Sequence, residues 1–123
     1  MKKEGILTKK FTFEASHFIP GHLKCGKNHG HSWKLFVSIK GKIKKNGMIL
    51  DFEQLSKEVN CRITEEFDHR CLNDFFEIPT CENIAIWIWN QLEEVFSKLE
   101  VDLYKIKLQE TEDNYFEYYG NKR

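Results

Sequence analysis

Alternation of apolar and polar residues marks two strands in the first third of the chain. In residues 9–18, every second position carries a side chain of one face: Phe11, Phe13, Ala15 and His17. Residues 31–43 alternate in the same way, with one face made of Trp33, Leu35, Val37 and Ile39. A period of two predicts strands with one buried face. Residues 18–29 are expected to form the connecting loop, and Asn46-Gly47 predicts a later turn.

The middle of the chain changes to a period of three to four residues. In residues 51–67 this period predicts an amphipathic helix whose apolar side chains are Phe52, Leu55, Val59, Ile63 and Phe67. Pro79 and Thr80 mark the start of a second helix. Its apolar stripe consists of Ile84, Ile88, Leu92, Val95 and Leu99, widened by Ala85, Trp89 and Phe96. Two helices are therefore expected between the terminal strands.

The last part of the chain alternates again. Residues 102–110 are expected to place four side chains on one face of a strand: Tyr104, Ile106, Leu108 and Glu110. An aromatic final strand is expected within residues 114–120. The order β-β-α-α-β-β predicts one α+β domain over residues 1–123, with a four-stranded antiparallel sheet and two helices on one face. The open edges of such a sheet favour self-association.

Charge and hydropathy narrow the class of protein. The 123 residues carry 19 basic and 19 acidic side chains, so the overall charge does not favour a nucleic acid or a membrane surface as partner. The sequence shows neither an apolar run of about 18 residues nor the pattern of a secretory signal. We therefore expect a cytoplasmic protein with reduced thiols.

Three histidines suggest a metal site. His29 and His31 project to the same side if the second strand reaches His29, because side chains on a strand repeat every two residues. His17 ends the first strand with inward parity and is the natural third ligand, while His22 in the loop is a rival. Three neutral imidazoles with one open position are typical of catalytic zinc. The alternative is a buried core histidine beside an incidental His-Gly-His.

Cys25 stands close to these histidines, between Lys24 and Lys27. In one interpretation it completes a closed, structural Cys-His₃ zinc site. In the other it is a catalytic thiolate, since neighbouring lysines and a metal would lower its pKa. Such a thiolate could accept a proton from a substrate whose oxygen the metal polarises.

Two further polar positions are candidates for chemistry. Asp68 precedes His69, and a carboxylate beside a histidine can fix its tautomer and raise its basicity. The alternative is a helix end closed by His69 and Arg70. Glu110 ends an apolar row, so it is either a solvated strand end or a partly buried carboxylate suited to a planar N–H edge.

Five motifs occur in one order over nearly the whole chain: FEASHFIP, CGKNHGHSW, GMILDFEQL, DHRCLND with PTCENIAIWIW, and KLQET. In this set the chain resembles the 6-pyruvoyltetrahydropterin synthase superfamily. The C-x-x-x-H-G-H spacing is most similar to the 6-carboxy-5,6,7,8-tetrahydropterin synthases of the queuosine pathway. Animal-type pyruvoyl synthases usually have a longer gap between the cysteine and H-G-H.

The resemblance implies roles for individual residues. His17, His29 and His31 match zinc ligands, and Cys25 matches the catalytic proton acceptor. Asp68 and His69 match the dyad that works opposite it, and Glu110 matches the carboxylate that holds the pterin ring. Thr80 and Cys81 match a segment whose backbone lies along the pterin, although the family often has serine or threonine in place of Cys81. Lys24 and Lys27 are candidates for binding the triphosphate.

The resemblance also implies a fold, a substrate and an assembly. The family has the tunnelling fold, in which trimers close a barrel and two trimers stack into a hexamer with active sites between subunits. The implied reaction converts 7,8-dihydroneopterin triphosphate to 6-carboxy-5,6,7,8-tetrahydropterin with release of acetaldehyde and triphosphate. The alternatives are a pyruvoyl synthase that eliminates triphosphate, a His₃-zinc hydrolase, and a non-catalytic protein that binds pterin or metal.

Overall fold

The computed structural model describes residues 3–23 and 26–121, and its framework is a long antiparallel ribbon. Strand β1 (Glu4–His17) pairs with β2 (His29–Lys42) along the full length of both. Phe13 and Trp33 are direct partners on the buried face. The two predicted strands are confirmed, and β2 reaches His29, which the metal hypothesis required. The ribbon begins earlier than predicted, because residues 4–8 continue the pairing with 38–42.

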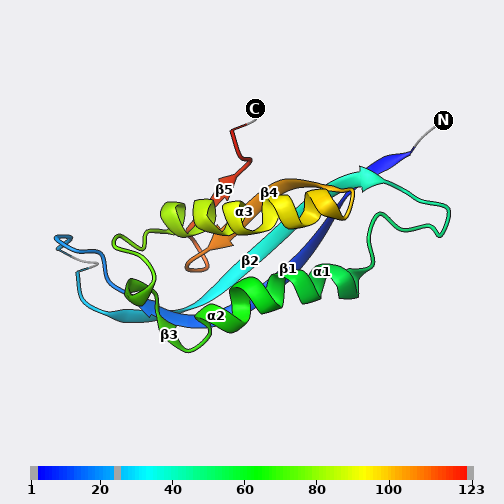
Figure 1. Ribbon diagram of the computed structural model, residues 1–123. Helices are drawn as coiled ribbons and strands as arrows, with labels where there is room; N and C mark the ends of the chain where they lie inside the picture. Colours follow the sequence, from blue (N-terminus) through cyan, green and yellow to red (C-terminus); the bar gives the residue numbers. More distant parts are fainter. Residues whose placement is uncertain (1–2, 24–25, 122–123) are drawn as a thin grey trace.

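Two helical regions cover one face of the sheet. The first comprises α1 (Phe52–Val59), a π-helical turn η1 (Asn60–Thr64) and α2 (Glu65–Phe67), so the predicted helix over 51–67 is divided. The second is α3 (Cys81–Lys98). α1 packs against β1 and α3 against β4, on the same side of the sheet (Figure 1). Of the predicted stripe on the first helix only Phe52, 51% exposed, lies outside the core.

The sheet has five strands, not the four predicted. β4 (Asp102–Gln109) pairs with β2, and β5 (Tyr115–Tyr118) pairs with β4, both antiparallel as expected. The additional strand β3 (Arg70–Cys71) runs parallel to the end of β1 and leads into a 3₁₀ turn η2 (Leu72–Asp74). The sheet order is β3-β1-β2-β4-β5. A two-residue strand has no alternation to reveal it, so the sequence pattern missed it.

The predicted face of β4 is partly wrong. Ile106 and Leu108 are fully buried, but Tyr104 is 38% exposed and Leu103 takes its place in the core. The cause is an irregularity in the pairing, where Ser38 pairs with Lys105 while Ile39 pairs with Leu103. The extra residue of such a β-bulge reverses the side-chain alternation beyond it.

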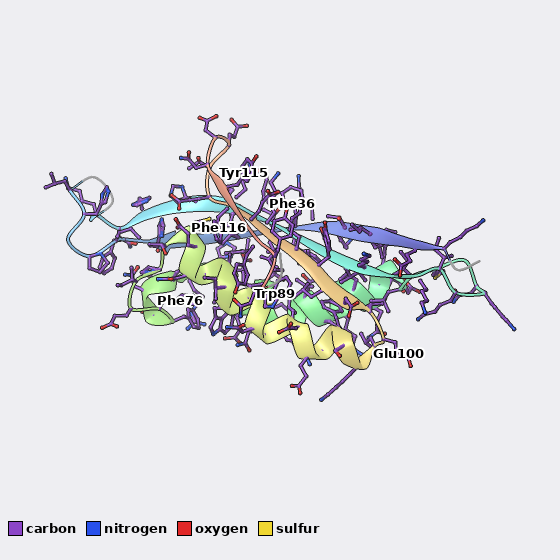
Figure 2. The ribbon with its side chains drawn as sticks, turned by 90° about the horizontal axis from the view of Figure 1, so that it is seen from above. Phe36, Phe76, Trp89, Glu100, Tyr115 and Phe116 are labelled. Carbon is purple, nitrogen blue, oxygen red and sulfur yellow. The ribbon has the colours of Figure 1, made fainter. Side chains whose placement is uncertain are left out.

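The end of α3 and the end of β5 both depend on left-handed backbone. Glu100 has φ 65° at the point where α3 turns toward β4 (Figure 2). Gly120, with φ 74°, lets the chain after β5 pass so close to Trp89 of α3 that a Cβ there would lie 2.6 Å from the indole. Within the described residues, no helix is long and apolar enough to cross a membrane.

Candidate metal centre

Three imidazoles meet where the β1–β2 ribbon opens into its connecting loop. His17 pairs directly with His29 across the two strands, and His31 follows two residues later on the same face. The ring centroids are 4.8 Å apart for His17 and His29, 4.7 Å for His29 and His31, and 5.3 Å for His17 and His31. The predicted trio is therefore brought together, and His17 rather than the rival His22 belongs to the cluster.

Backbone carbonyls orient two of these rings. The Nδ1 atom of His17 lies 2.8 Å from the carbonyl oxygen of Pro79, and that of His29 lies 2.6 Å from the carbonyl oxygen of Lys27. A carbonyl only accepts, so both Nδ1 atoms carry the proton and both Nε2 atoms present a lone pair. In the sequence Pro79 marks only the start of a helix, and no sequence signal points to its contact with His17.

Two Nε2 atoms of the cluster have no hydrogen-bond partner within the part of the chain that the structure describes. Nε2 of His17 and of His31 are buried and make no hydrogen bond. A buried polar atom without a partner is costly, and such atoms are rare in folded proteins. Burial also lowers the pKa of His31 below its ordinary value of 6.5, an effect that Glu110 partly opposes. The imidazole of His31 is thus neutral near pH 7, as a ligand of a divalent metal must be.

Glu110 belongs to the same cluster. It follows β4, and its backbone N–H donates to the carbonyl of Asn114 across a tight turn. Its Oε2 lies 3.4 Å from Nε2 of His31 and 3.8 Å from Nε2 of His17, and the side chain is 22% exposed. The four residues each offer one ligand atom, and these atoms lie within 4.8 Å of one another. Three imidazole nitrogens and a carboxylate oxygen are a donor set that suits zinc.

Trp33 forms the floor beneath the histidines. Its indole is fully buried, donates from Nε1 to the carbonyl of Ala15 at 3.1 Å, and stacks on Phe13. It also makes edge-to-face contacts with His17 at 5.0 Å and with His31 at 5.6 Å. The alternation along β2 predicts Trp33 in the core, but no sequence signal relates it to the site. Its contacts restrict the orientation of two candidate ligands.

Asp68 and His69 contact each other as predicted, but they lie apart from the histidine cluster. Asp68 accepts from Nδ1 of His69 at 3.0 Å and from the backbone N–H of Glu14 at 2.8 Å, and the second contact is the main reason that the pKa of Asp68 is lowered. His69 has φ 62°, and its side chain is 80% exposed. In the described part of the chain, neither residue joins the four-residue cluster.

His69 instead borders an open cavity of about 400 Å³. Glu14, Ser16 and Ser32 line it with side chains that alternate with the buried ones of β1 and β2, so the cavity opens on the helix-free face of the ribbon. His31 of the histidine cluster also borders it, although its side chain lies on the same face as that of Trp33. Within the described residues of one chain, His69 is therefore near the end of the ribbon but outside the four-residue cluster.

Thr80 and Cys81 connect the cluster to α3. The Thr80 hydroxyl caps the helix by accepting from the backbone N–H of Asn83 at 3.1 Å. The thiol of Cys81 donates to the carbonyl of Leu108 at 3.1 Å, and burial raises its pKa to about 12. Both side chains are therefore engaged in the fold. Their backbone lies between Pro79, which contacts His17, and the end of β4, which leads to Glu110.

The remaining candidates lie at or beyond the limit of the structure. Cys25 and Lys24 are outside the described residues. Lys27 is exposed, and its carbonyl orients His29.

Comparison with known proteins identifies the family of this chain. The family model described as 6-pyruvoyl tetrahydropterin synthase matches residues 6–121. A protein of Archaeoglobus fulgidus, described provisionally as a 6-carboxy-5,6,7,8-tetrahydropterin synthase, is 43% identical over 95% of this chain and 97% of its own. The 6-pyruvoyl tetrahydrobiopterin synthase of Dictyostelium discoideum is 34% identical over 98% of this chain and 99% of its own.

The fold also matches a solved structure. The structure of the Caenorhabditis elegans 6-pyruvoyl tetrahydropterin synthase superposes with a TM-score of 0.86 at 28% identity, and the match covers 97% of each chain. The ordered motifs, the histidine cluster and these similarities lead to one conclusion: the chain belongs to the 6-pyruvoyl tetrahydropterin synthase family.

Proposed function

We propose that this protein is a zinc-dependent carbon–carbon lyase that converts 7,8-dihydroneopterin triphosphate to 6-carboxy-5,6,7,8-tetrahydropterin, releasing acetaldehyde and triphosphate. The observation that carries the proposal is the histidine cluster with its two buried, unpartnered Nε2 atoms. His17, His29 and His31 would hold the metal, which supplies a Lewis acid that makes the side-chain hydroxyls of the substrate more acidic. An adjacent carbon–carbon bond can then break in a retro-aldol sense.

The other residues position the substrate and move protons. Glu110 would accept from the ring N–H and amino group of the pterin, and the backbone at Thr80 and Cys81 would lie along its ring. Cys25 would accept a proton on one side of the substrate side chain. Asp68 would orient His69 through their 3.0 Å contact, and His69 would exchange a proton on the other side. Lys24 and Lys27 would bind the triphosphate.

We further propose that the active site is shared between subunits of a homo-oligomer built from trimers, most simply a hexamer. Among the described residues of one chain, Asp68 and His69 are not part of the histidine cluster, and this is what a site completed by a neighbouring subunit predicts. The short outer strands β3 and β5 leave edges that neighbouring copies can pair with, closing a barrel. We assign the enzyme to the cytoplasm and to queuosine biosynthesis. The free thiols of Cys61, Cys71 and Cys81 are compatible with a reducing compartment.

A second candidate function is 6-pyruvoyltetrahydropterin synthesis, which eliminates triphosphate and keeps the three-carbon side chain. It is supported by the relative of that name, which is similar over nearly the whole chain. Mass spectrometry of the products formed from 7,8-dihydroneopterin triphosphate separates the two. Acetaldehyde and the carboxylated ring support the lyase, and a pyruvoyl product overturns it. If no pterin product forms, a His₃-zinc hydrolase or a non-catalytic binding protein remains.

The metal assignment is tested separately. His29→Ala and His31→Ala should both lose zinc, and full zinc occupancy in both variants would contradict the assignment. Cys25→Ala should keep zinc but lose most activity. A loss of zinc in that variant would instead support the closed Cys-His₃ site.

A further inference from the structure

Glu110 is closer to the histidines than its assigned role requires. A carboxylate that only holds the pterin ring has no reason to approach the metal ligands. Yet its Oε2 lies 3.4 Å and 3.8 Å from the Nε2 atoms of His31 and His17. In a tetrahedral site with metal–ligand bonds of about 2.1 Å, the ligand atoms are about 3.4 Å apart. The separation from His31 matches this value and the separation from His17 is slightly longer, so both are close to those of ligands of one ion.

The chemistry of these contacts points to a cation between the groups. The Nδ1 atom of His17 faces the carbonyl of Pro79 and carries its proton, so Nε2 presents a lone pair toward Glu110. The unprotonated Nε2 atom of His17 and the carboxylate oxygen that faces it repel unless a cation lies between them. Within residues 3–23 and 26–121, no hydrogen-bond donor other than these imidazoles reaches the carboxylate of Glu110.

The position of Glu110 in the fold makes an exchange of partners feasible. Glu110 follows the last residue of β4, and its backbone is held by the hydrogen bond to Asn114. Its side chain is 22% exposed, so one side of the carboxylate is open to an incoming molecule while the other faces the imidazoles. A rotation of the side chain is enough to change partner, with no movement of the strand.

We propose that Glu110 is the fourth metal ligand in the substrate-free protein, and that its carboxylate leaves the metal to accept from the pterin ring when substrate enters. The bond between the carboxylate oxygen and the metal breaks, and the vacated position becomes free for a substrate oxygen. The second half of this proposal rests on the proposed pterin function, and the first half does not. Glu110 thereby couples recognition of the pterin ring to the opening of a coordination position on the metal.

The test uses Co²⁺ as a spectroscopic probe on the metal-free, full-length protein, with Glu110→Gln as the variant. Glutamine keeps the shape of the side chain but removes the charged oxygen. Glu112→Gln is the matched control, because it changes an exposed carboxylate two residues along the same hairpin. Affinity for Co²⁺ is measured by competition with a chelator, and the coordination geometry is followed by visible absorption.

We expect Glu110→Gln to bind Co²⁺ at least about tenfold more weakly, since loss of even an outer partner of a metal ligand has that effect. Its visible spectrum should also differ from that of the wild type, whereas Glu112→Gln should match the wild type in both. An unchanged affinity and spectrum in Glu110→Gln would overturn the ligand assignment. His29→Ala serves as reference: if it binds Co²⁺ as the wild type does, the proposed histidine site itself is wrong.

The exchange is tested by adding pterin, the ring without a side chain, to the Co²⁺ protein. If the carboxylate leaves the metal for the ring, the wild-type spectrum should shift toward that of Glu110→Gln, and the variant should not respond. A wild-type spectrum that stays constant while pterin binds would overturn the exchange. In that case the ligand assignment would still stand on the affinity measurement.

Discussion

Replacing Trp33 with phenylalanine should weaken both the core and the metal site. Trp33 is fully buried, and its Nε1 donates to the carbonyl of Ala15. Phenylalanine keeps the stacking on Phe13 but leaves a cavity, and the lost apolar burial and the cavity together cost about 2 kcal/mol. The lost hydrogen bond adds about 1 kcal/mol. For 123 residues the unfolding entropy is about 0.26 kcal/mol/K, so the Tm should fall by about 12 °C.

The assay compares thermal unfolding of the metal-free protein at one fixed concentration, because the midpoint of an oligomer depends on concentration. Trp87→Phe is the control, since Trp87 is only partly buried and contacts Phe67 and Phe76 rather than the histidines. Trp33→Phe should also bind Co²⁺ more weakly, because His17 and His31 lose the ring that restricts them. If the two variants have equal midpoints and wild-type metal affinity, Trp33 does not support the site.

Three further outcomes are expected. Glu100→Gly should raise the free energy of unfolding by about 1 kcal/mol, because glycine adopts φ 65° without the penalty of a Cβ. A lower thermal midpoint would show that the Glu100 side chain stabilises the protein by more than its left-handed backbone conformation destabilises it. Cys81 should resist iodoacetamide at pH 8, since its pKa of about 12 keeps the thiol protonated, whereas the exposed Cys61 should react. Peptide mass spectrometry measures the labelling of each cysteine, and equal labelling would contradict the burial of Cys81. The metal-free protein should lose stability as the pH falls below 6.5, because the unfolded state then binds a proton that the buried His31, with its lowered pKa, does not take up. Urea midpoints measured against pH should show a smaller dependence in His31→Asn than in the wild type. An equal dependence in both proteins would refute this explanation.

Periodicity in the sequence was sufficient to predict that the three candidate metal ligands come together. The alternation that buries Phe13 and Trp33 also sets the side to which His17 and His31 point, so the face of each histidine follows from the strand pattern. The helix start at Thr80 was equally visible, because capping is a local interaction between a side chain and the following turn.

Features that depend on contacts between distant segments were not visible. The bulge that exposes Tyr104 arises from the pairing of β4 with β2, and the parallel strand at Arg70 exists only because β1 lies beside it. The approach of Glu110 to His31 likewise depends on where the end of β4 lies relative to β2. A pattern along one segment reports the face of a residue but not which remote residue it meets.

Because His17 pairs directly with His29, a bound metal would stabilise only the native register of β1 and β2. A slip of one residue between β1 and β2 would turn His29 to the opposite face and remove it from the site. Metal binding energy is therefore available only to the correctly paired ribbon, and at a free metal concentration one hundred times Kd it amounts to about 2.7 kcal/mol. A metal held by these histidines would therefore also favour, among the possible pairings of the two longest strands, the one that places His17 beside His29.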